Sequence, residues 1–127
     1  MKIDVFSHII PVKYKEALHK MTMSHKSRHG PREVDKIEAL PSLFDLDVRF
    51  RLMDKYEGLL QVLTLGAPAV EDIAVPKDAI ELAQIANDGM AELVRKYPDK
   101  FIAAVACLPM NDMDAAMKEL ERAITEL

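Results

Sequence analysis

The sequence predicts an α/β fold with parallel strands. Three short apolar segments, starting near residues 2, 59 and 101, alternate with segments whose apolar residues recur every three or four positions. Apolar runs of this length are typical of strands covered by other elements, and the longer recurrence is typical of amphipathic helices. An order in which strands and helices alternate places the strands parallel, joined by right-handed crossover connections.

The first predicted strand spans residues 2–10, and Pro11 ends it. It is rich in residues that are branched at Cβ and favour strands, namely Ile3, Val5, Ile9 and Ile10. Residues 12–42 follow a less regular pattern, because turn-forming residues and Pro41 interrupt the apolar positions. A short helix over 13–21 is the regular element that we expect there.

A second helix is predicted to start at Asp45 or Asp47, since either side chain can cap its first turn. One face of this helix carries Leu46, Phe50 and Met53. Gly58 stands where the glycine that ends a helix is expected. Residues 59–65 form the second predicted strand, a near-continuous apolar run of the kind that is usually covered on both faces.

The third helix is predicted to begin at Pro76 and to end before Pro98. Its apolar stripe comprises Ala79, Leu82, Ala83, Ala86, Met90, Leu93, Val94 and Tyr97. A third buried strand is expected over 101–107. Asn111 can cap the last helix, whose inner face is predicted to comprise Met113, Met117, Leu120, Ile124 and Leu127.

These elements are too few for a closed fold. Three parallel strands leave two open sheet edges, whereas a complete (β/α)₈ barrel takes about 250 residues. The sequence supplies three such units in 127 residues, with 12–42 as an insertion between the first strand and its helix. We therefore expect residues 1–127 to be a single incomplete barrel domain that stops at an internal boundary of a larger fold. The open edges favour self-association, so a homo-oligomer is expected.

Composition and charge exclude several classes of protein. The net charge of −4 argues against a general nucleic-acid binder, and no apolar run approaches the roughly 20 residues that span a bilayer. The N-terminus enters a strand pattern directly, without a secretory signal. With Cys107 as its one cysteine, the chain can form no internal disulfide, which fits a cytoplasmic protein.

Three stretches of the sequence together resemble a known family. They are residues 3–11, residues 47–63, and the set formed by 86–88, 97–101 and 108–109. In this order and spacing they resemble the amidohydrolase-2 branch of the amidohydrolase superfamily, which includes α-amino-β-carboxymuconate-ε-semialdehyde decarboxylase and the hydroxybenzoate decarboxylases. The resemblance implies a metal-dependent hydrolase-type (β/α)₈ TIM barrel, with a divalent metal at the C-terminal ends of its strands. This chain would form the first three of its eight units.

His8 matches a metal ligand on the family's first strand. The family signature there is His-x-His, and its second histidine binds the metal. A neutral imidazole near the C-terminal end of a barrel strand suits zinc and similar ions. The resemblance therefore implies that His8 binds a divalent metal, with zinc expected. Without the resemblance, a hydrogen-bonded core histidine is the simpler interpretation.

Phe6 departs from the family pattern. It stands where the first histidine of the signature is expected, and a phenyl ring cannot bind a metal. Alternate residues of a strand share a face, so Phe6 is expected to line the pocket beside His8. Two interpretations stay open. The metal is held by His8 together with ligands after residue 127, or metal binding is lost and the protein is a non-catalytic relic of the barrel.

The basic segment 12–36 carries a net charge of +4 and follows the first strand, on the side of the barrel where the metal is expected. Arg28 and Arg32 are candidates for binding a substrate carboxylate through forked hydrogen bonds. A solvated loop is the simpler alternative for this segment. The remaining histidines are expected to be exposed to solvent: His19, His25 and His29.

Several other polar residues are interpreted as structural. Cys107 ends a buried strand and is expected to be a small core residue rather than a nucleophile. Arg49 and Arg51 are interpreted as ion-pairing residues that stabilise their helix. Asn87 and Asp88 lie within a predicted helix and are expected to be structural too.

The function implied by the resemblance is that of a metal-dependent decarboxylase or hydrolase, acting on a small carboxylate-bearing aromatic or unsaturated substrate. A bound divalent ion polarises a substrate oxygen or lowers the pKa of a bound water toward about 7. The catalytic acid–base residues are expected on later strands, so none is assigned and this chain alone is expected to be inactive. A small doubly wound binding or signalling module is a third alternative. Such a module needs about five strands and, for signalling, an aspartate after the third strand, which this sequence lacks.

Overall fold

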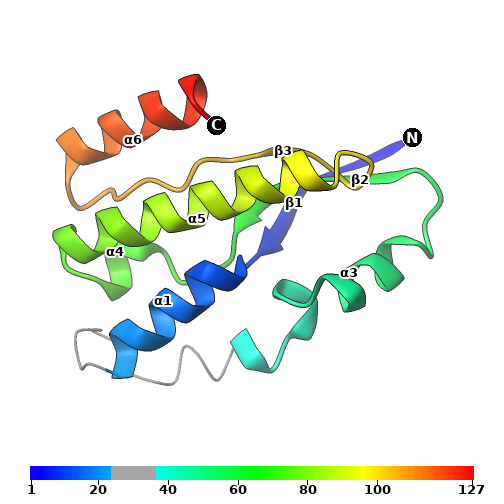
Figure 1. The fold of residues 1–127 in the computed structure, drawn as a ribbon, viewed down its shortest axis with the longest axis horizontal. Helices are drawn as coiled ribbons and strands as arrows, with labels where there is room; N and C mark the ends of the chain where they lie inside the picture. Colours follow the sequence, from blue (N-terminus) through cyan, green and yellow to red (C-terminus); the bar gives the residue numbers. More distant parts are fainter. Residues whose placement is uncertain (24–36) are drawn as a thin grey trace.

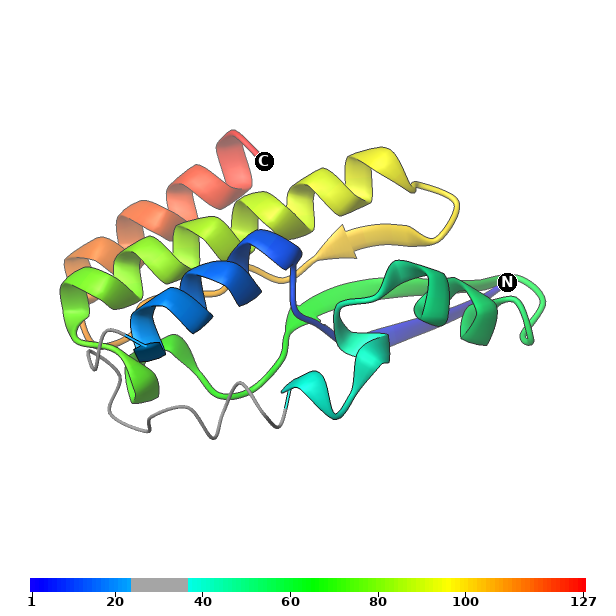
Figure 2. The ribbon, with the colours of Figure 1, turned by 60° about the horizontal axis from the view of Figure 1, so that its bottom comes forward.

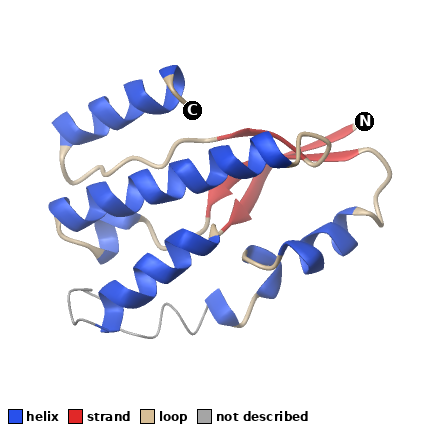
Figure 3. Ribbon diagram, viewed as in Figure 1, coloured by secondary structure: helices blue, strands red, loops and turns tan. Residues whose placement is uncertain are grey.

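The computed structural model describes residues 1–23 and 37–127, and within them it shows a parallel three-stranded sheet with helices. The strands are β1 (Lys2–Ile9), β2 (Leu59–Leu65) and β3 (Phe101–Ala104), in the spatial order β1-β2-β3 (Figures 1 and 3). Both strand pairs are parallel. The predicted α/β class with parallel strands is therefore confirmed.

An irregularity interrupts the pairing of β1 with β2. The register shifts between Asp4, which pairs with Gln61, and Ser7, which pairs with Leu63. The Asp4 carboxylate accepts hydrogen bonds from the backbone N–H of Phe6 at 3.1 Å and from the Ser7 hydroxyl at 2.6 Å. The side chain of Asp4 thus binds the extra residue of a β-bulge, a feature that re-aims the side chains around it.

The first two helices lie near their predicted positions. Helix α1 (Val12–Met23) follows β1, the short 3-10 helix η1 comprises Pro41–Leu43, and α3 comprises Leu46–Met53. Asp45 caps α3, because its carboxylate accepts a hydrogen bond from the backbone N–H of Val48 at 3.1 Å. Gly58 was expected to end this helix, but the helix ends five residues earlier, at Met53, with Asp54 as its C-terminal cap. Gly58 instead turns the chain into β2 with a positive φ of 69°.

Helix α5 (Pro76–Lys96) begins at the predicted proline, and the preceding turn of helix α4 (Val70–Ile73) was not predicted. Most of the predicted apolar stripe of α5 is buried, and the rest is half-buried. Figure 1 shows α5 passing in front of the strands, with α3 below it. These two helices and the sheet enclose a core around Ile9, Met53, Leu63, Met90 and Phe101.

Helix α5 also packs tightly against the start of α1. A Cβ atom at Gly89 would lie 2.6 Å from Cβ and 3.1 Å from Cγ of Pro11, which is closer than real contacts allow. The proline ring is rigid and cannot turn away. Glycine at this position therefore permits the close approach of α5 to the end of β1.

Replacing Gly89 with alanine is expected to destabilise the protein by about 1–2 kcal/mol. Overpacking against Pro11 costs about 1–3 kcal/mol, which outweighs the gain of up to about 1 kcal/mol in helix propensity. Urea unfolding followed by circular dichroism measures this change, with the exposed Glu81→Ala on the same helix as the control. A Gly89→Ala protein that is more stable than wild type would show that the helix has room to move.

The third strand differs from its prediction. A buried strand was expected over 101–107, but β3 ends at Ala104, and Ile102 and Val105 are exposed. Within the described structure β3 lies at the edge of the sheet, so β2 alone pairs with it. Beyond β3 the side chain of Asn87 takes the place of a strand partner. Its amide donates to the Cys107 carbonyl at 2.9 Å and accepts from the Cys107 N–H at 2.7 Å.

The last helix, α6 (Met113–Thr125), is capped by Asp112 and not by Asn111. Asn111 instead donates to the Ala74 carbonyl. The predicted inner face is less buried than expected: Leu120 is half-buried, and the other four residues are exposed, namely Met113, Met117, Ile124 and Leu127. Three of the five, Leu120, Ile124 and Leu127, line a hollow of about 340 Å³ that α6 shares with α5 and β3. Figures 1 and 2 both show α6 alongside α5, and the residues that α6 buries are Ala116 and Glu119.

A polar network joins α6 to α5. The Glu119 carboxylate is buried and accepts from Asn87 at 2.7 Å, and Arg122 binds both of its oxygens at 2.8–2.9 Å. Arg122 also pairs with Asp88 on α5 at 2.7 Å. Burial by itself would raise the pKa of Glu119, but the hydrogen bonds from Arg122 and Asn87 outweigh burial, so this pKa lies below its ordinary value. The structural role expected for Asn87 and Asp88 agrees with these contacts.

Within the described residues, no helix is long and apolar enough to cross a membrane.

Candidate functional site

His8 lies one residue before the C-terminal end of β1. Its neighbour Ile9 belongs to the core beneath α3 and α5, and successive side chains of a strand point to opposite faces. His8 therefore lies on the face of the sheet that is opposite to α3 and α5, which we call the open face. On β3, Phe101 belongs to the same core as Ile9, so its neighbour Ile102 points to the open face, and Ile102 is 41% exposed. The corresponding face is the interior in a (β/α)₈ barrel.

The end of β2 holds the His8 imidazole in one orientation. Nδ1 of His8 lies 3.2 Å from the carbonyl oxygen of Leu65 and 3.1 Å from the hydroxyl of Thr64. The Leu65 carbonyl can only accept a hydrogen bond, whereas the Thr64 hydroxyl can donate or accept, so the carbonyl contact favours the tautomer with the proton on Nδ1. The lone pair of the neutral ring is then on Nε2. A backbone carbonyl that binds one ring nitrogen while the other binds the metal is the usual arrangement of metal-bound histidines.

Phe6 stands beside His8, as the strand period predicts. The centroids of the two rings are 4.6 Å apart in an edge-to-face arrangement, and Phe6 is 70% exposed. Phe6 lies within the irregular segment Asp4–Ser7, and His8 directly follows that segment. The phenyl ring therefore presents an apolar surface next to the imidazole.

The donor set around His8 fits one part of a metal site. In residues 1–23 and 37–127, no group of three or more His, Cys, Asp and Glu side chains is close enough to hold a metal ion. His8 offers a lone pair on Nε2, and Phe6 offers none. A metal held here would thus need further ligands from outside the described residues.

Behind His8, on the side of the helices, lies a buried guanidinium. Arg49 of α3 is 6% exposed, and its Nη1 donates to the carbonyl oxygens of His8 at 2.8 Å and Ser42 at 3.1 Å. Its Nε donates to the side chain of Gln61 at 2.9 Å. Among the described residues, neutral acceptors replace the ion pairs expected for Arg49 and Arg51, and Arg51 donates to the carbonyl of Asp47. The predicted position of Arg49 in a helix did not indicate that its side chain contacts His8.

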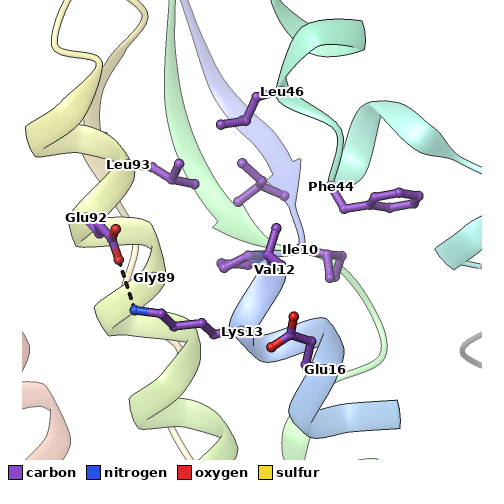
Figure 4. A pocket seen from close by; sticks show the side chains of 11 residues that line it. Ile10, Val12, Lys13, Glu16, Phe44, Leu46, Gly89, Glu92 and Leu93 are labelled. Carbon is purple, nitrogen blue, oxygen red and sulfur yellow. Dashed lines mark hydrogen bonds and ion pairs between the residues drawn. The ribbon is translucent and has the colours of Figure 1, made fainter.

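Two hollows lie close to this strand. One of about 400 Å³ lies beside β1, at the edge of the described sheet, between this strand and residues of η1 and α3. It is lined by Phe6, His8, Arg49 and Gln61, among others. Another of about 370 Å³ lies on the helix side between α1, α3 and α5 (Figure 4). Lys13 and Glu92 form an ion pair of 3.4 Å beside the second hollow, and its lining does not include His8. The hollow at the edge of β1 is therefore the one that belongs to the candidate site.

The other predicted site residues are not gathered around His8 in the described structure. Arg28 and Arg32 lie outside the described residues, as do His25 and His29. His19 is on α1 and exposed, as expected.

Burial, and to a smaller extent the nearby carboxylates of Glu71 and Glu119, raise the pKa of the Cys107 thiol to about 12. A thiol with so high a pKa is a poor nucleophile, in agreement with its expected role as a core residue.

Curated proteins similar to this chain are decarboxylases. The γ-resorcylate decarboxylase of Rhodococcus jostii is 45% identical over 94 residues, which are 73% of this chain and 28% of the relative. The 2-amino-3-carboxymuconate-6-semialdehyde decarboxylase of Dictyostelium discoideum is 29% identical over an alignment of 142 positions, which covers 100% of this chain and 38% of the relative. No protein-family model matches the chain.

Several solved structures with the same fold are also decarboxylases. The 2,6-dihydroxybenzoate decarboxylase from Rhizobium superposes with a TM-score of 0.70 at 34% identity, covering 98% of this chain and 35% of that protein. A structure of 2,6-dihydroxybenzoate decarboxylase complexed with 2,6-dihydroxybenzoate matches at 36% identity. The 5-carboxyvanillate decarboxylase of Novosphingobium aromaticivorans, complexed with manganese, has a TM-score of 0.75 over 100% of this chain and 39% of that protein. Its identity of 23% makes this a likeness of fold alone.

The chain matches the N-terminal part of these proteins and spans 28% to 39% of their length. The structural neighbours are TIM-barrel decarboxylases, so the parallel sheet corresponds to the first strands of a barrel.

Proposed function

The chain belongs to the amidohydrolase-2 branch of the amidohydrolase superfamily, and from this premise we propose that the full-length protein is a metal-dependent decarboxylase of small aromatic carboxylates. The observation that carries the proposal is the 45% identity to γ-resorcylate decarboxylase over 94 residues. The decarboxylase names of the relatives favour loss of carbon dioxide over hydrolysis, the other reaction that the sequence implies.

In this proposal His8 holds a divalent metal through Nε2. Its Nδ1 would donate to the Leu65 carbonyl, 3.2 Å away, and this bond would orient the ring on the open face. When bound, such an ion would polarise a substrate oxygen or lower the pKa of a bound water. Imidazole suits zinc, the metal expected from the sequence, and the manganese in the Novosphingobium structure makes manganese the alternative.

Phe6 is proposed to line the substrate pocket. Its exposed ring lies next to His8 and offers a flat apolar surface to an aromatic substrate, with which ring contacts are favourable. Arg28 and Arg32 remain the proposed partners of the substrate carboxylate. The further metal ligands and the acid–base residue are proposed to lie outside the described residues, so residues 1–127 alone would be inactive. A cytoplasmic location and a homo-oligomer remain proposals as well.

A second candidate is a non-catalytic member of the family. Phe6 replaces a residue that binds metal in the family signature, and the described residues place one metal-binding side chain at the site. This candidate differs from the first in its metal content, because a protein that has lost the site retains no bound ion.

The test is to measure bound metal and decarboxylation in the full-length protein. We expect about one divalent ion per chain and release of carbon dioxide from 2,6-dihydroxybenzoate, lost on chelation and restored by adding the ion back. Elemental analysis and detection of the decarboxylated product measure the two quantities. A protein without metal or turnover would support the non-catalytic candidate, and in that case Phe6→His is expected to bring metal binding back.

A further inference from the structure

We propose that Arg49 is a positioning residue for His8, acting from the opposite face of the sheet through the backbone of β1. This inference rests on the proposed function, in which His8 binds the metal. In this proposal the buried Arg49 holds β1 in the position at which the His8 imidazole contacts the end of β2.

The contacts of Arg49 join three parts of the chain that surround His8. One nitrogen, Nη1, donates to the carbonyl of His8 on β1 and to the carbonyl of Ser42 on η1. Another, Nε, donates to the side chain of Gln61 on β2. A planar guanidinium with several donors in fixed directions holds these acceptors at set distances from one another.

The same network reaches the β-bulge that precedes His8. The amide nitrogen of Gln61 lies 3.4 Å from the carboxylate of Asp4, which itself binds Phe6 N–H and the Ser7 hydroxyl. Asp4 thus binds the irregular segment Asp4–Ser7, and Arg49 binds His8, the residue that follows this segment. The part of β1 between these anchors is the part that carries Phe6 and His8.

Stability alone does not account for a charge in this place. Arg49 is buried against neutral acceptors, and burial lowers its pKa, although the charge of Asp4 opposes this shift. Replacing buried charged groups by apolar residues of similar volume is often neutral or stabilising. An apolar residue, however, could not donate a hydrogen bond to the His8 carbonyl. The imidazole contact to Leu65 at 3.2 Å is at the long end of the range for hydrogen bonds, so a small shift of β1 would break it.

The test is the tautomer of His8 in Arg49→Met, read from the ring nitrogens by ¹⁵N NMR. Spectra are recorded about two units above the ordinary imidazole pKa of about 6.5, so that the rings are neutral. The His8 signals are identified by their absence in His8→Gln. In the wild-type protein we expect the Nδ1–H form. In Arg49→Met we expect the ratio of Nδ1–H to Nε2–H to fall at least about fivefold, which corresponds to one net hydrogen bond.

Arg51→Met is the matched control, because Arg51 lies on the same helix, is exposed and is expected to leave the tautomer unchanged. Thermal unfolding of each variant shows that it is folded. If Arg49→Met does not fold, Gln61→Met removes the acceptor of Nε and the contact to Asp4 while keeping the charge. A smaller fall in the ratio is then expected, because Nη1 of Arg49 keeps its bond to the His8 carbonyl.

Folded variants that keep the wild-type tautomer would overturn the positioning role. The tautomer is read without metal and without substrate. Failure of this proposal is therefore distinguishable from failure of the proposed decarboxylase function, which the metal content and turnover of the wild-type protein decide.

Discussion

In a metal-loaded full-length protein, replacement of His8 by glutamine is expected to lower the bound metal to background and decarboxylation by more than about 100-fold. Changes to the groups that merely orient a metal ligand lower affinity or activity by about 10- to 100-fold, and His8 is proposed to be a ligand itself. Glutamine is of similar size, and its amide can still donate to the Leu65 carbonyl, so the strand end is expected to keep its structure. Elemental analysis and the rate of product formation measure the two effects.

His19→Gln is the matched control for this experiment. His19 is exposed on α1, so the same chemical change is expected to leave metal content and turnover at the wild-type values. If His8→Gln keeps its metal and activity, His8 is a core histidine held by Leu65 and Thr64, and the metal is bound by other residues.

Replacing Asn87 with leucine is expected to destabilise the protein by about 3–5 kcal/mol. The change keeps the volume but leaves the backbone N–H and C=O of Cys107 without their partner, and it removes one of the two hydrogen bonds to Oε1 of the buried Glu119 carboxylate. Each buried group left unsatisfied costs about 1–3 kcal/mol, and more where it is charged. Urea unfolding followed by circular dichroism measures the loss. The neighbouring Asp88→Asn removes only an exposed ion pair to Arg122 and is expected to cost less than about 1 kcal/mol.

The effect of Asn87→Leu is also expected to depend on pH. The pKa of Glu119 is lower in the folded protein than the ordinary value of 4.5, so its contribution to stability is present above that pH. The contribution is lost as the pH falls through the folded-state pKa. The difference in unfolding free energy between wild type and Asn87→Leu should therefore narrow in acid. Equal stability of Asn87→Leu and Asp88→Asn at neutral pH would contradict the role of the buried network.

The elements that were predicted well are those with strong local signals. The strand at 59–65 and the helix that starts at Pro76 agree with their predictions, because an apolar run and an N-terminal proline are properties of the local chain. The face of α6 could not be found in this way. Its apolar residues suggested burial, but Ile124 and Leu127 are exposed along a hollow that α6 shares with α5 and β3. The contact that α6 does bury is polar, because Glu119 binds Asn87, which lies 32 positions away in the sequence.

The candidate site was predictable only in part. The strand period placed Phe6 and His8 on one face, and the family resemblance singled out His8. The groups that hold His8 carried no comparable signal: Thr64 is one polar residue in an apolar strand, and Arg49 is one basic residue in an amphipathic helix. Their contacts with His8 join residues that are 41 to 57 positions apart, and such contacts arise only when the strands and α3 come together.

Sequence by itself determined the alternation of strands and helices, the parallel sheet and the position of one imidazole near the end of the first strand. These features follow from side-chain periodicity and chain connectivity, which are local. Tertiary structure alone decided the contacts of Nδ1 of His8 with the end of β2, the burial of the Arg49 guanidinium behind β1 and the polar network between α5 and α6. The reason is physical: a buried polar group must find partners wherever the folded chain supplies them, and these partners come from distant parts of the sequence.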